Sequence, residues 1–220
     1  MVICDKYNPE ELVEAAKSGK YFAEAVVRTL FNRVREIFIN EPNVLRYRQI
    51  DTCSLVITSI GEGITYGFYD ECLSKYGHSG IWNFCCEVFD SIPLAAVIDD
   101  RVLCVHGGLS PKIHTISEIH SINRLNSSRG AGVLFGRTAV ETFLEENQLQ
   151  LICRSHQLCL EGYKYLWDQK LLTIWSAPNY TYSCKNKAAV VRFIPDGTCA
   201  FSVFEAADNP HVQAEALYTV

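Results

Sequence analysis

The fold is decided by the stretch Leu103-Cys104-Val105-His106-Gly107-Gly108-Leu109-Ser110-Pro111. It begins with three apolar residues, continues through a histidine and two glycines, and closes with Ser-Pro. This pattern predicts a short buried strand that stops where α/β proteins place their ligands. The glycines allow the backbone to bend sharply at that point. His106 is therefore either a ligand or catalyst displayed at a strand end, or a histidine that only closes a tight turn.

Two further apolar runs end in polar side chains. The stretch Leu149–Gln157 ends in Arg154-Ser155-His156-Gln157, and the stretch Leu171–Tyr180 ends in an asparagine and a tyrosine. We expect the three strand ends to form a rim of imidazole, guanidinium and phenol groups. Such a rim suits a metal ion and an oxyanion, because imidazole binds divalent metals and guanidinium binds phosphate.

The amino-terminal residues predict two helices. The first should begin at Asn8-Pro9-Glu10-Glu11, where a cap residue, a proline and carboxylates coincide, and should end at Gly19. The second should stop before Pro42. Its apolar residues recur at every fourth position, which predicts a stripe that packs in the core. The stripe consists of Phe22, Val26, Leu30, Val34 and Phe38.

Two hairpins are expected in the remainder of the chain. The run Pro93–Ile98 should pair with the strand that leads to His106, with Asp99-Asp100 as the turn between them. The runs Ala188–Phe193 and Thr198–Phe204 alternate apolar and polar residues, as the two strands of a final hairpin do.

The composition is that of an ordinary globular protein. Of 220 residues, 48% are hydrophobic and 20% are charged, and the formal net charge of -5 argues against nucleic acid as a partner. The ten cysteines are scattered, without a Cys-x-x-Cys pair or a leading signal sequence. We therefore expect reduced thiols and a location in the cytoplasm or the nucleus. No apolar run approaches the roughly 20 residues that span a bilayer, so no membrane contact is expected.

Five motifs, in order along the chain, resemble signatures of the phosphoprotein phosphatase family. They are Tyr66-Gly67-Phe68-Tyr69-Asp70-Glu71-Cys72, His106-Gly107-Gly108-Leu109-Ser110-Pro111, Arg129-Gly130-Ala131-Gly132, Arg154-Ser155-His156-Gln157 and Ser176-Ala177-Pro178-Asn179-Tyr180. Within that family the chain is most similar to the serine/threonine phosphatases of types 2A, 4 and 6. The resemblance extends from about Tyr66 to Ala207.

The resemblance implies an α/β fold, a metallophosphatase-like two-sheet β-sandwich flanked by helices, with one sheet incomplete. It divides the chain into an N-terminal helical segment, residues 1–42, and a truncated metallophosphatase-like domain, residues 43–220. A sheet that lacks strands should expose strand edges and apolar surface, which favours aggregation or a partner.

The resemblance also implies a chemistry. The family hydrolyses phosphoserine and phosphothreonine in proteins with two divalent metal ions, manganese or iron and zinc. By this resemblance His106 and His156 are ligands of one and the same ion. Arg129 matches a phosphate-binding arginine and Tyr180 the tyrosine that lines the site, so these two are the expected catalytic and substrate-binding residues. Arg154 is expected in a structural role beside them. The expected partners are phosphoprotein substrates and the regulatory or scaffold subunits of phosphatases.

Much of the family's metal site is missing from this chain. Three motifs expected before Tyr66 are absent: Gly-Asp-x-His-Gly, Gly-Asp-x-Val-Asp-Arg-Gly and Gly-Asn-His-Glu. By resemblance they would supply four ion ligands, the general-acid histidine and a second phosphate-binding arginine. At about 10-fold for each ligand, their loss predicts about 10⁴-fold lower activity, before the loss of the general acid is counted. We expect at most one weakly bound ion and almost no hydrolysis.

Several interpretations stay open. The chain is a weak phosphatase, an inactive pseudophosphatase that binds regulatory subunits, or the product of a spliced transcript or gene model that lacks coding segments. The residues have structural alternatives as well. In these, His106 and His156 only hydrogen-bond within a relict pocket, Arg129 pairs with a carboxylate such as Glu161, and Tyr180 is a core residue.

Overall fold

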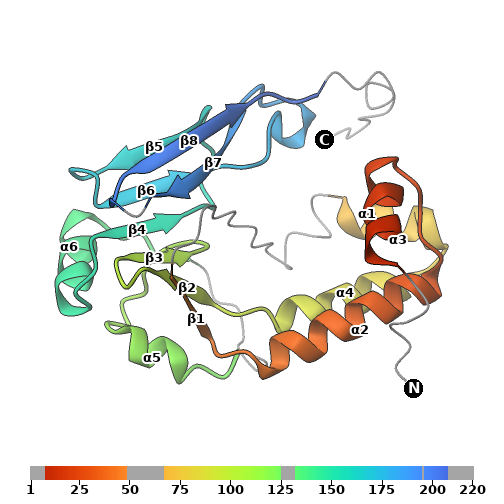
Figure 1. The fold of residues 1–220 in the computed structure, drawn as a ribbon, viewed down its shortest axis with the longest axis horizontal. Coiled ribbons are helices and arrows are strands. Elements are labelled where there is room, and N and C mark those ends of the chain that lie inside the picture. The colour runs from red at the N-terminus through yellow and green to blue at the C-terminus, as the bar shows by residue number, and fades with distance from the viewer. Residues whose placement is uncertain (1–7, 49–66, 125–131, 195, 208–220) are drawn as a thin grey trace. The chain divides into compact units, whose positions relative to one another are not determined.

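The fold is described from a computed structural model, for residues 8–48, 67–124, 132–194 and 196–207 (Figure 1). These residues belong to two compact units. Unit 1 contains the helices α1 (Pro9–Lys17), α2 (Glu24–Asn40), α3 (Phe68–Tyr76) and α4 (Gly80–Asp90).

Unit 2 contains the strands and the remaining helices. The strands are β1 (Val44–Tyr47), β2 (Ala95–Ile98), β3 (Val102–Val105), β4 (Leu151–Arg154), β5 (Glu161–Leu166), β6 (Leu171–Ile174), β7 (Lys187–Phe193) and β8 (Cys199–Phe204). The helices are α5 (Ile116–His120), α6 (Arg137–Glu146) and the 3₁₀ turn η4 (Tyr180–Tyr182). The chain enters unit 2 between Pro42 and Asn43, while α3 and α4 return to unit 1. The division into domains at residues 42 and 43 stays a prediction.

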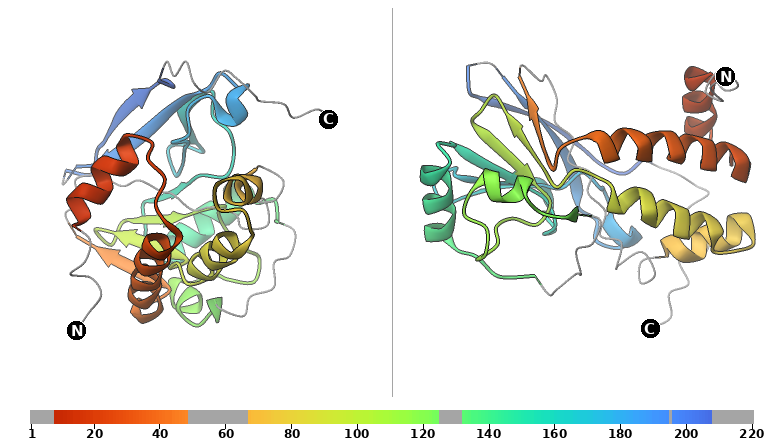
Figure 2. Two further views of the ribbon diagram at one scale, coloured as in Figure 1. Left: turned by 90° about the vertical axis from the view of Figure 1, so that its right-hand side faces the viewer. Right: turned by 90° about the horizontal axis from the view of Figure 1, so that it is seen from below.

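Unit 1 is helical, and α2 runs beside α4 within it (Figure 2). The predicted start of the first helix is confirmed, because the side-chain oxygen of Asn8 accepts the Glu10 N–H at 3.0 Å. The buried hydrophobic cluster of this unit consists of Cys72 on α3 and of Ile81 and Cys85 on α4.

The core stripe predicted for α2 is only partly right. No residue of α2 is fully buried, and Leu30 in the middle of the predicted stripe is 36% exposed. Val27 and Phe31 make the contact with the buried cluster instead. These two positions lie one helical step around from the predicted stripe, so α3 and α4 cover the neighbouring face of α2.

The eight strands that the structure describes in unit 2 form one sheet in the order β1-β2-β3-β4-β6-β5-β7-β8. At its centre, β4 pairs in parallel with β3 on one side and with β6 on the other. Both predicted hairpins are confirmed, since β2 pairs antiparallel with β3 and β7 with β8. Asp99 and Asp100 are the central residues of the turn in the first hairpin, closed by the Arg101 N–H that donates to the Ile98 carbonyl at 3.0 Å, and their φ angles of 50° and 53° are positive, as hairpin turns favour.

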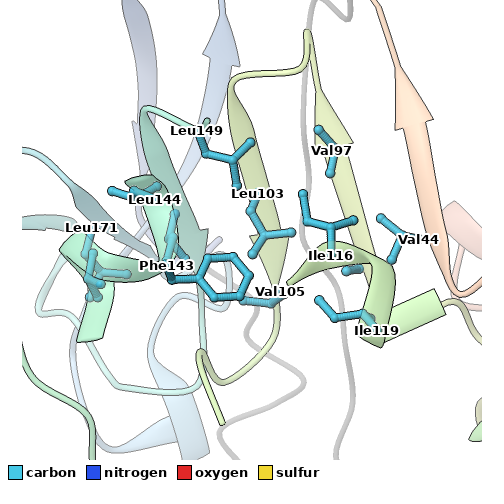
Figure 3. Close-up of a cluster of buried hydrophobic side chains, with 13 residues drawn as sticks. Val44, Val97, Leu103, Val105, Ile116, Ile119, Phe143, Leu144, Leu149 and Leu171 are labelled. Atoms are coloured by element: carbon cyan, nitrogen blue, oxygen red, sulfur yellow. The ribbon is translucent and has the colours of Figure 1, made fainter. Parts of the chain in front are cut away.

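Helices α5 and α6 cover one face of the sheet. Figure 3 shows Ile116 of α5 and Phe143 of α6 directed toward Leu103 and Val105 of β3, and these residues belong to one buried cluster. The same strand serves the opposite face through alternate residues, because side chains of a strand point to its two sides in turn. Cys104, for example, belongs to the second cluster.

The second cluster shows that the sheet curls. It joins Cys104 and Cys153, on the central strands, to Val191 of β7, and Phe201 of β8 packs against it. Strands far apart in the order of the sheet therefore meet across one core, so a single curled sheet provides two layers (Figure 1). Among the described strands, β1 and β8 have one neighbour each, so the sheet is open at both edges. The predicted α/β class with an incomplete sheet is confirmed.

The helices that the structure describes include none that combines the length and the apolar character needed to cross a membrane.

Candidate functional site

Three polar strand ends meet at one edge of the sheet. The register pairs Val105 of β3 with Arg154 of β4, and Arg154 with Thr173 of β6. Because these strands are parallel, the residues that follow their carboxyl ends lie at the same edge. His106 follows β3 immediately, His156 comes two residues after β4, and η4 follows β6. The sequence expectation of three neighbouring strand ends is therefore met in the topology.

The two histidines are in direct contact. The Nε2 atom of His106 lies 3.1 Å from the Nδ1 atom of His156, and the ring centroids are 5.0 Å apart at an interplanar angle of 72°. A backbone hydrogen bond of 2.9 Å, donated by the Ser155 N–H to the His106 carbonyl, joins the two strand ends beside the rings. The separation of the two nitrogens suits a hydrogen bond in the absence of a metal.

The same separation also suits shared coordination of one ion. Two nitrogens at about 2.1 Å from an ion are about 3.0 Å apart at a right angle and about 3.4 Å apart at the tetrahedral angle. His106 Nε2 and His156 Nδ1, at 3.1 Å, fall within this range. The distance between the two nitrogens is therefore compatible with shared coordination of one divalent ion.

A second ion does not fit in the same way. Among the residues that the structure describes, no group of three or more histidine, cysteine, aspartate or glutamate side chains is placed to hold a metal. The described part of the chain thus offers two imidazoles for one ion and no ligand set for a dinuclear centre.

His156 stands at the apex of a tight turn. Its φ angle is 71°, and the Gln157 N–H donates a hydrogen bond of 2.9 Å to the Ser155 carbonyl across it. Arg154 lies behind this turn and is only 5% exposed. Burial lowers the pKa of its guanidinium. The guanidinium expected in the rim of the site is therefore not exposed there. It donates hydrogen bonds to the Ser155 carbonyl and the Gln157 side chain instead, in line with the structural role expected for Arg154.

Of the other predicted site residues, the structure describes Tyr180 but not Arg129. Arg129 lies outside the described residues, so its phosphate-binding role stays a prediction. Glu161, suggested as its alternative partner, lies 3.5 Å from the Lys187 ammonium. Tyr180 begins η4 and packs edge-on against Trp175, with ring centroids 4.9 Å apart. Its role in the site also stays a prediction.

Asn186 has a structural role that the sequence analysis did not predict. Asn186 is 3% exposed, and its side-chain oxygen accepts the Tyr180 N–H at 2.8 Å. Its amide group donates to the carbonyls of Ala177 and Lys187 at 2.8 and 2.9 Å. Asn186 therefore holds the loop that carries Tyr180. The signal in the sequence is weak: a single asparagine between a polar turn and an apolar strand.

Comparison with known proteins points to one family. The sequence profile of the calcineurin-like phosphoesterases matches residues 51–160. The chain is 47% identical over 165 residues to the serine/threonine-protein phosphatase 4 catalytic subunit of Kluyveromyces lactis, a match that covers 64% of this chain and 54% of that protein. It is 48% identical over 152 residues to the serine/threonine-protein phosphatase 6 catalytic subunit of Drosophila melanogaster, covering 58% and 50% respectively.

The fold has a counterpart among solved structures. A protein serine/threonine phosphatase from Saccharomyces cerevisiae superposes with a TM-score of 0.78, over 93% of this chain and 98% of that one, at 21% identity. This likeness confirms the metallophosphatase-like fold. The chain spans about half the length of the curated relatives it matches.

Proposed function

This chain belongs to the calcineurin-like phosphoesterase family, in the branch of the type 2A, 4 and 6 protein phosphatases, and we propose that it is a phosphatase subunit with half a metal site. It holds one divalent ion between His106 and His156 and faces phosphoserine or phosphothreonine of a protein substrate. Its hydrolysis of that substrate is very slow. The observation that carries the proposal is the 3.1 Å approach of His106 Nε2 to His156 Nδ1 at the carboxyl ends of two parallel strands.

The residues of the chain would divide the work as follows. His106 and His156, as neutral imidazoles, would hold a divalent ion such as manganese, iron or zinc. When bound, such an ion polarises a phosphoryl oxygen and lowers the pKa of a coordinated water. Arg129 would neutralise phosphate oxygens through its guanidinium, and Tyr180 would contact the phosphate from the loop that Asn186 holds.

The slow rate follows from what the described residues do not supply. A dinuclear phosphatase site needs about six ligands, a bridging carboxylate and a general acid for the leaving alkoxide. The described part of the chain groups no third ligand with the two histidines. Without the second ion and the acid, the attacking water and the leaving group both lose their activation.

Metal binding and turnover test the proposal together. Isothermal titration with manganese should show one weak site in the purified chain, and His106→Ala and His156→Ala should each abolish it. Hydrolysis of a phosphoserine peptide with manganese should be as slow as that of His106→Ala. Binding that survives both substitutions would exclude the histidine pair as the metal site. A fast manganese-dependent rate abolished by His106→Ala would show that the site is completed by residues outside the described ranges.

A second candidate function is that of an inactive relative that binds the regulatory or scaffold subunits of phosphatases. It is favoured by the lack of a third ligand beside the histidine pair among the described residues, together with a fold that matches a phosphatase over 93% of the chain. Affinity purification of the tagged chain from cells should recover such subunits, beside a full-length relative as positive control. Their absence from the chain's own eluate, with recovery by the control, would remove this candidate.

We place the protein in the cytoplasm, with the nucleus as a second compartment. None of the eight cysteines within the described residues forms a disulfide, which suits a reducing environment. Fluorescence imaging of the tagged chain checks this, and a signal confined to the secretory pathway would contradict it.

A further inference from the structure

Arg154 is a buried arginine whose placement serves no obvious purpose in packing. It is 5% exposed, and both of its hydrogen-bond acceptors are neutral. Its Nε atom has no hydrogen-bond partner among the described residues. Burial of a guanidinium without a carboxylate costs free energy, and an apolar side chain of similar volume would often be more stable in such a position. This cost in free energy indicates that the guanidinium N–H groups of Arg154 have a role beyond filling space.

The two acceptors of Arg154 bracket His156. One terminal nitrogen donates to the Ser155 carbonyl at 3.1 Å, and the other donates to the side-chain oxygen of Gln157. Ser155 and Gln157 are the residues on either side of His156. The planar guanidinium therefore hydrogen-bonds to both ends of the turn at once. The single ammonium group of a lysine does not present two donors in this fixed geometry.

The turn that Arg154 grips is a strained one. The hydrogen bond from the Gln157 N–H to the Ser155 carbonyl encloses a single residue, His156, whose φ angle is 71°. These features define a γ-turn with positive φ at its centre, a conformation that is rare and strained for a residue with a side chain. Such a backbone persists only where its surroundings hold it.

We propose that Arg154, acting with Gln157, is the positioning residue that holds this γ-turn and so keeps His156 Nδ1 within reach of His106 Nε2. That this positioning serves metal binding rests on the proposed function. Two imidazoles that are already held close together bind an ion without first ordering a loop. The positioning itself rests on the geometry of the turn. Arg154 touches neither substrate nor metal and acts only through His156.

The experiment separates positioning from both folding and metal binding. In the metal-free chain, labelled with ¹⁵N, a scalar coupling between the two ring nitrogens reports the hydrogen bond of the histidine pair directly. We expect this coupling in the unsubstituted chain, its loss in Arg154→Met and Arg154→Lys, and its retention in Gln157→Glu, which keeps an acceptor for the guanidinium. Arg192→Met, a substitution of an exposed arginine on β7, should leave it unchanged.

Thermal unfolding of the same variants shows whether a lost coupling only reflects a destabilised fold. Because methionine fills the space of Arg154 without a buried charge, Arg154→Met should unfold at the same temperature as the unsubstituted chain, or at a higher one. If Arg154→Met does not fold, Gln157→Met removes the second acceptor without touching the buried arginine and should also abolish the coupling. A coupling that persists in both substitutions, or that is absent from the unsubstituted chain, would overturn the inference.

Titration with cobalt(II), followed by visible absorption, then tests the link to metal. Arg154→Met should weaken cobalt binding at least about 10-fold, the effect typical of groups that orient metal ligands. If the coupling behaves as expected but no cobalt binding depends on His106, the positioning role stands and the proposed metal site fails. If cobalt binds through His106 with equal affinity in the unsubstituted chain and in Arg154→Met, the positioning role fails and the metal site stands.

Discussion

Gly108, two residues beyond His106, has no room for a side chain. Its φ angle is 134°, and a Cβ atom there would lie 2.3 Å from two ring carbons of Phe135. The ring cannot move freely, because it packs against the buried cluster beneath α5 and α6 and edge-on against Trp167. We expect Gly108→Ala to lower the free energy of unfolding by at least about 2 kcal/mol, through backbone strain and overpacking. Urea unfolding followed by circular dichroism measures this loss.

The neighbouring glycine is a matched control. A Cβ atom on Gly107 would meet no atom within 4 Å, so Gly107→Ala should change the free energy of unfolding by less than about 1 kcal/mol. Equal losses for the two substitutions would show that Phe135 gives way, and that the turn after His106 does not depend on a glycine at one particular position.

At the scale of elements, Asn43 joins the start of β1 to the carboxyl end of α5. The side chain is 9% exposed, and its amide nitrogen donates to the carbonyls of Ile119, His120 and Ile122 at 3.0, 3.1 and 2.6 Å. In Asn43→Asp a carboxylate of the same shape would face three carbonyl oxygens. We expect a loss of about 3 kcal/mol in the free energy of unfolding at neutral pH, because a buried charge then faces three acceptors in place of three hydrogen bonds.

The pH dependence of this variant gives a second check. The carbonyl oxygens would raise the pKa of the new carboxyl above its unfolded value, so the loss should shrink as the pH falls and the carboxyl becomes a donor again. Asn32→Asp, at an exposed position of α2, adds the same charge and should change stability little at any pH. A loss of stability in Asn43→Asp that stays constant from pH 7 to pH 4 would contradict this account.

The capping box of α5 makes a separate prediction for acid. The carboxylate of Glu118 accepts the N–H groups of His114 and Thr115 at 2.6 and 2.8 Å, and these hydrogen bonds lower its pKa below 4.5. Since the folded pKa lies below the unfolded one, its contribution to stability is complete above about pH 4.5 and is lost as the pH falls through the folded pKa. In thermal unfolding, the deficit of Glu118→Gln relative to the unsubstituted chain should therefore shrink between pH 6 and pH 3. Glu145→Gln, at an exposed position of α6, is the matched control for the charge change.

At the scale of the whole molecule, large apolar side chains remain at the surface of the described residues. Leu30 and Ile37 of α2 are 36% and 45% exposed, and their spacing of seven places them on the same side of the helix. We expect the purified chain to bind a hydrophobic dye and to self-associate in size-exclusion chromatography, as exposed apolar surface predicts. Replacement of both residues by lysine should reduce both signals severalfold.

The control for this prediction is a residue of the same helix that packs against the buried cluster. Val27 packs against the buried residues of unit 1, so Val27→Lys should loosen that unit and raise dye binding. If dye binding and elution do not change when Leu30 and Ile37 are both replaced, the apolar surface that causes them lies elsewhere.

The sequence by itself determined the elements whose causes are local. The start of α1 follows from Asn8 and Pro9, and the two hairpins follow from apolar runs joined by short turns. These features depend on residues within a few positions of one another, so periodicity and turn chemistry reveal them. The order of five motifs also indicated the family, which the matching profile over residues 51–160 confirms.

Only the tertiary structure decided which side chains meet. The contact between His106 and His156 spans fifty positions of the chain, and it exists because β3 and β4 pair in parallel with a fixed register. The same packing buried Arg154 beneath the turn that it now holds, and it turned Val27 and Phe31 toward the core in place of Leu30. The local sequence pattern predicts neither the burial of Arg154 nor the covered face of α2. An apolar stripe or a polar strand end does not indicate which other element will pack against it.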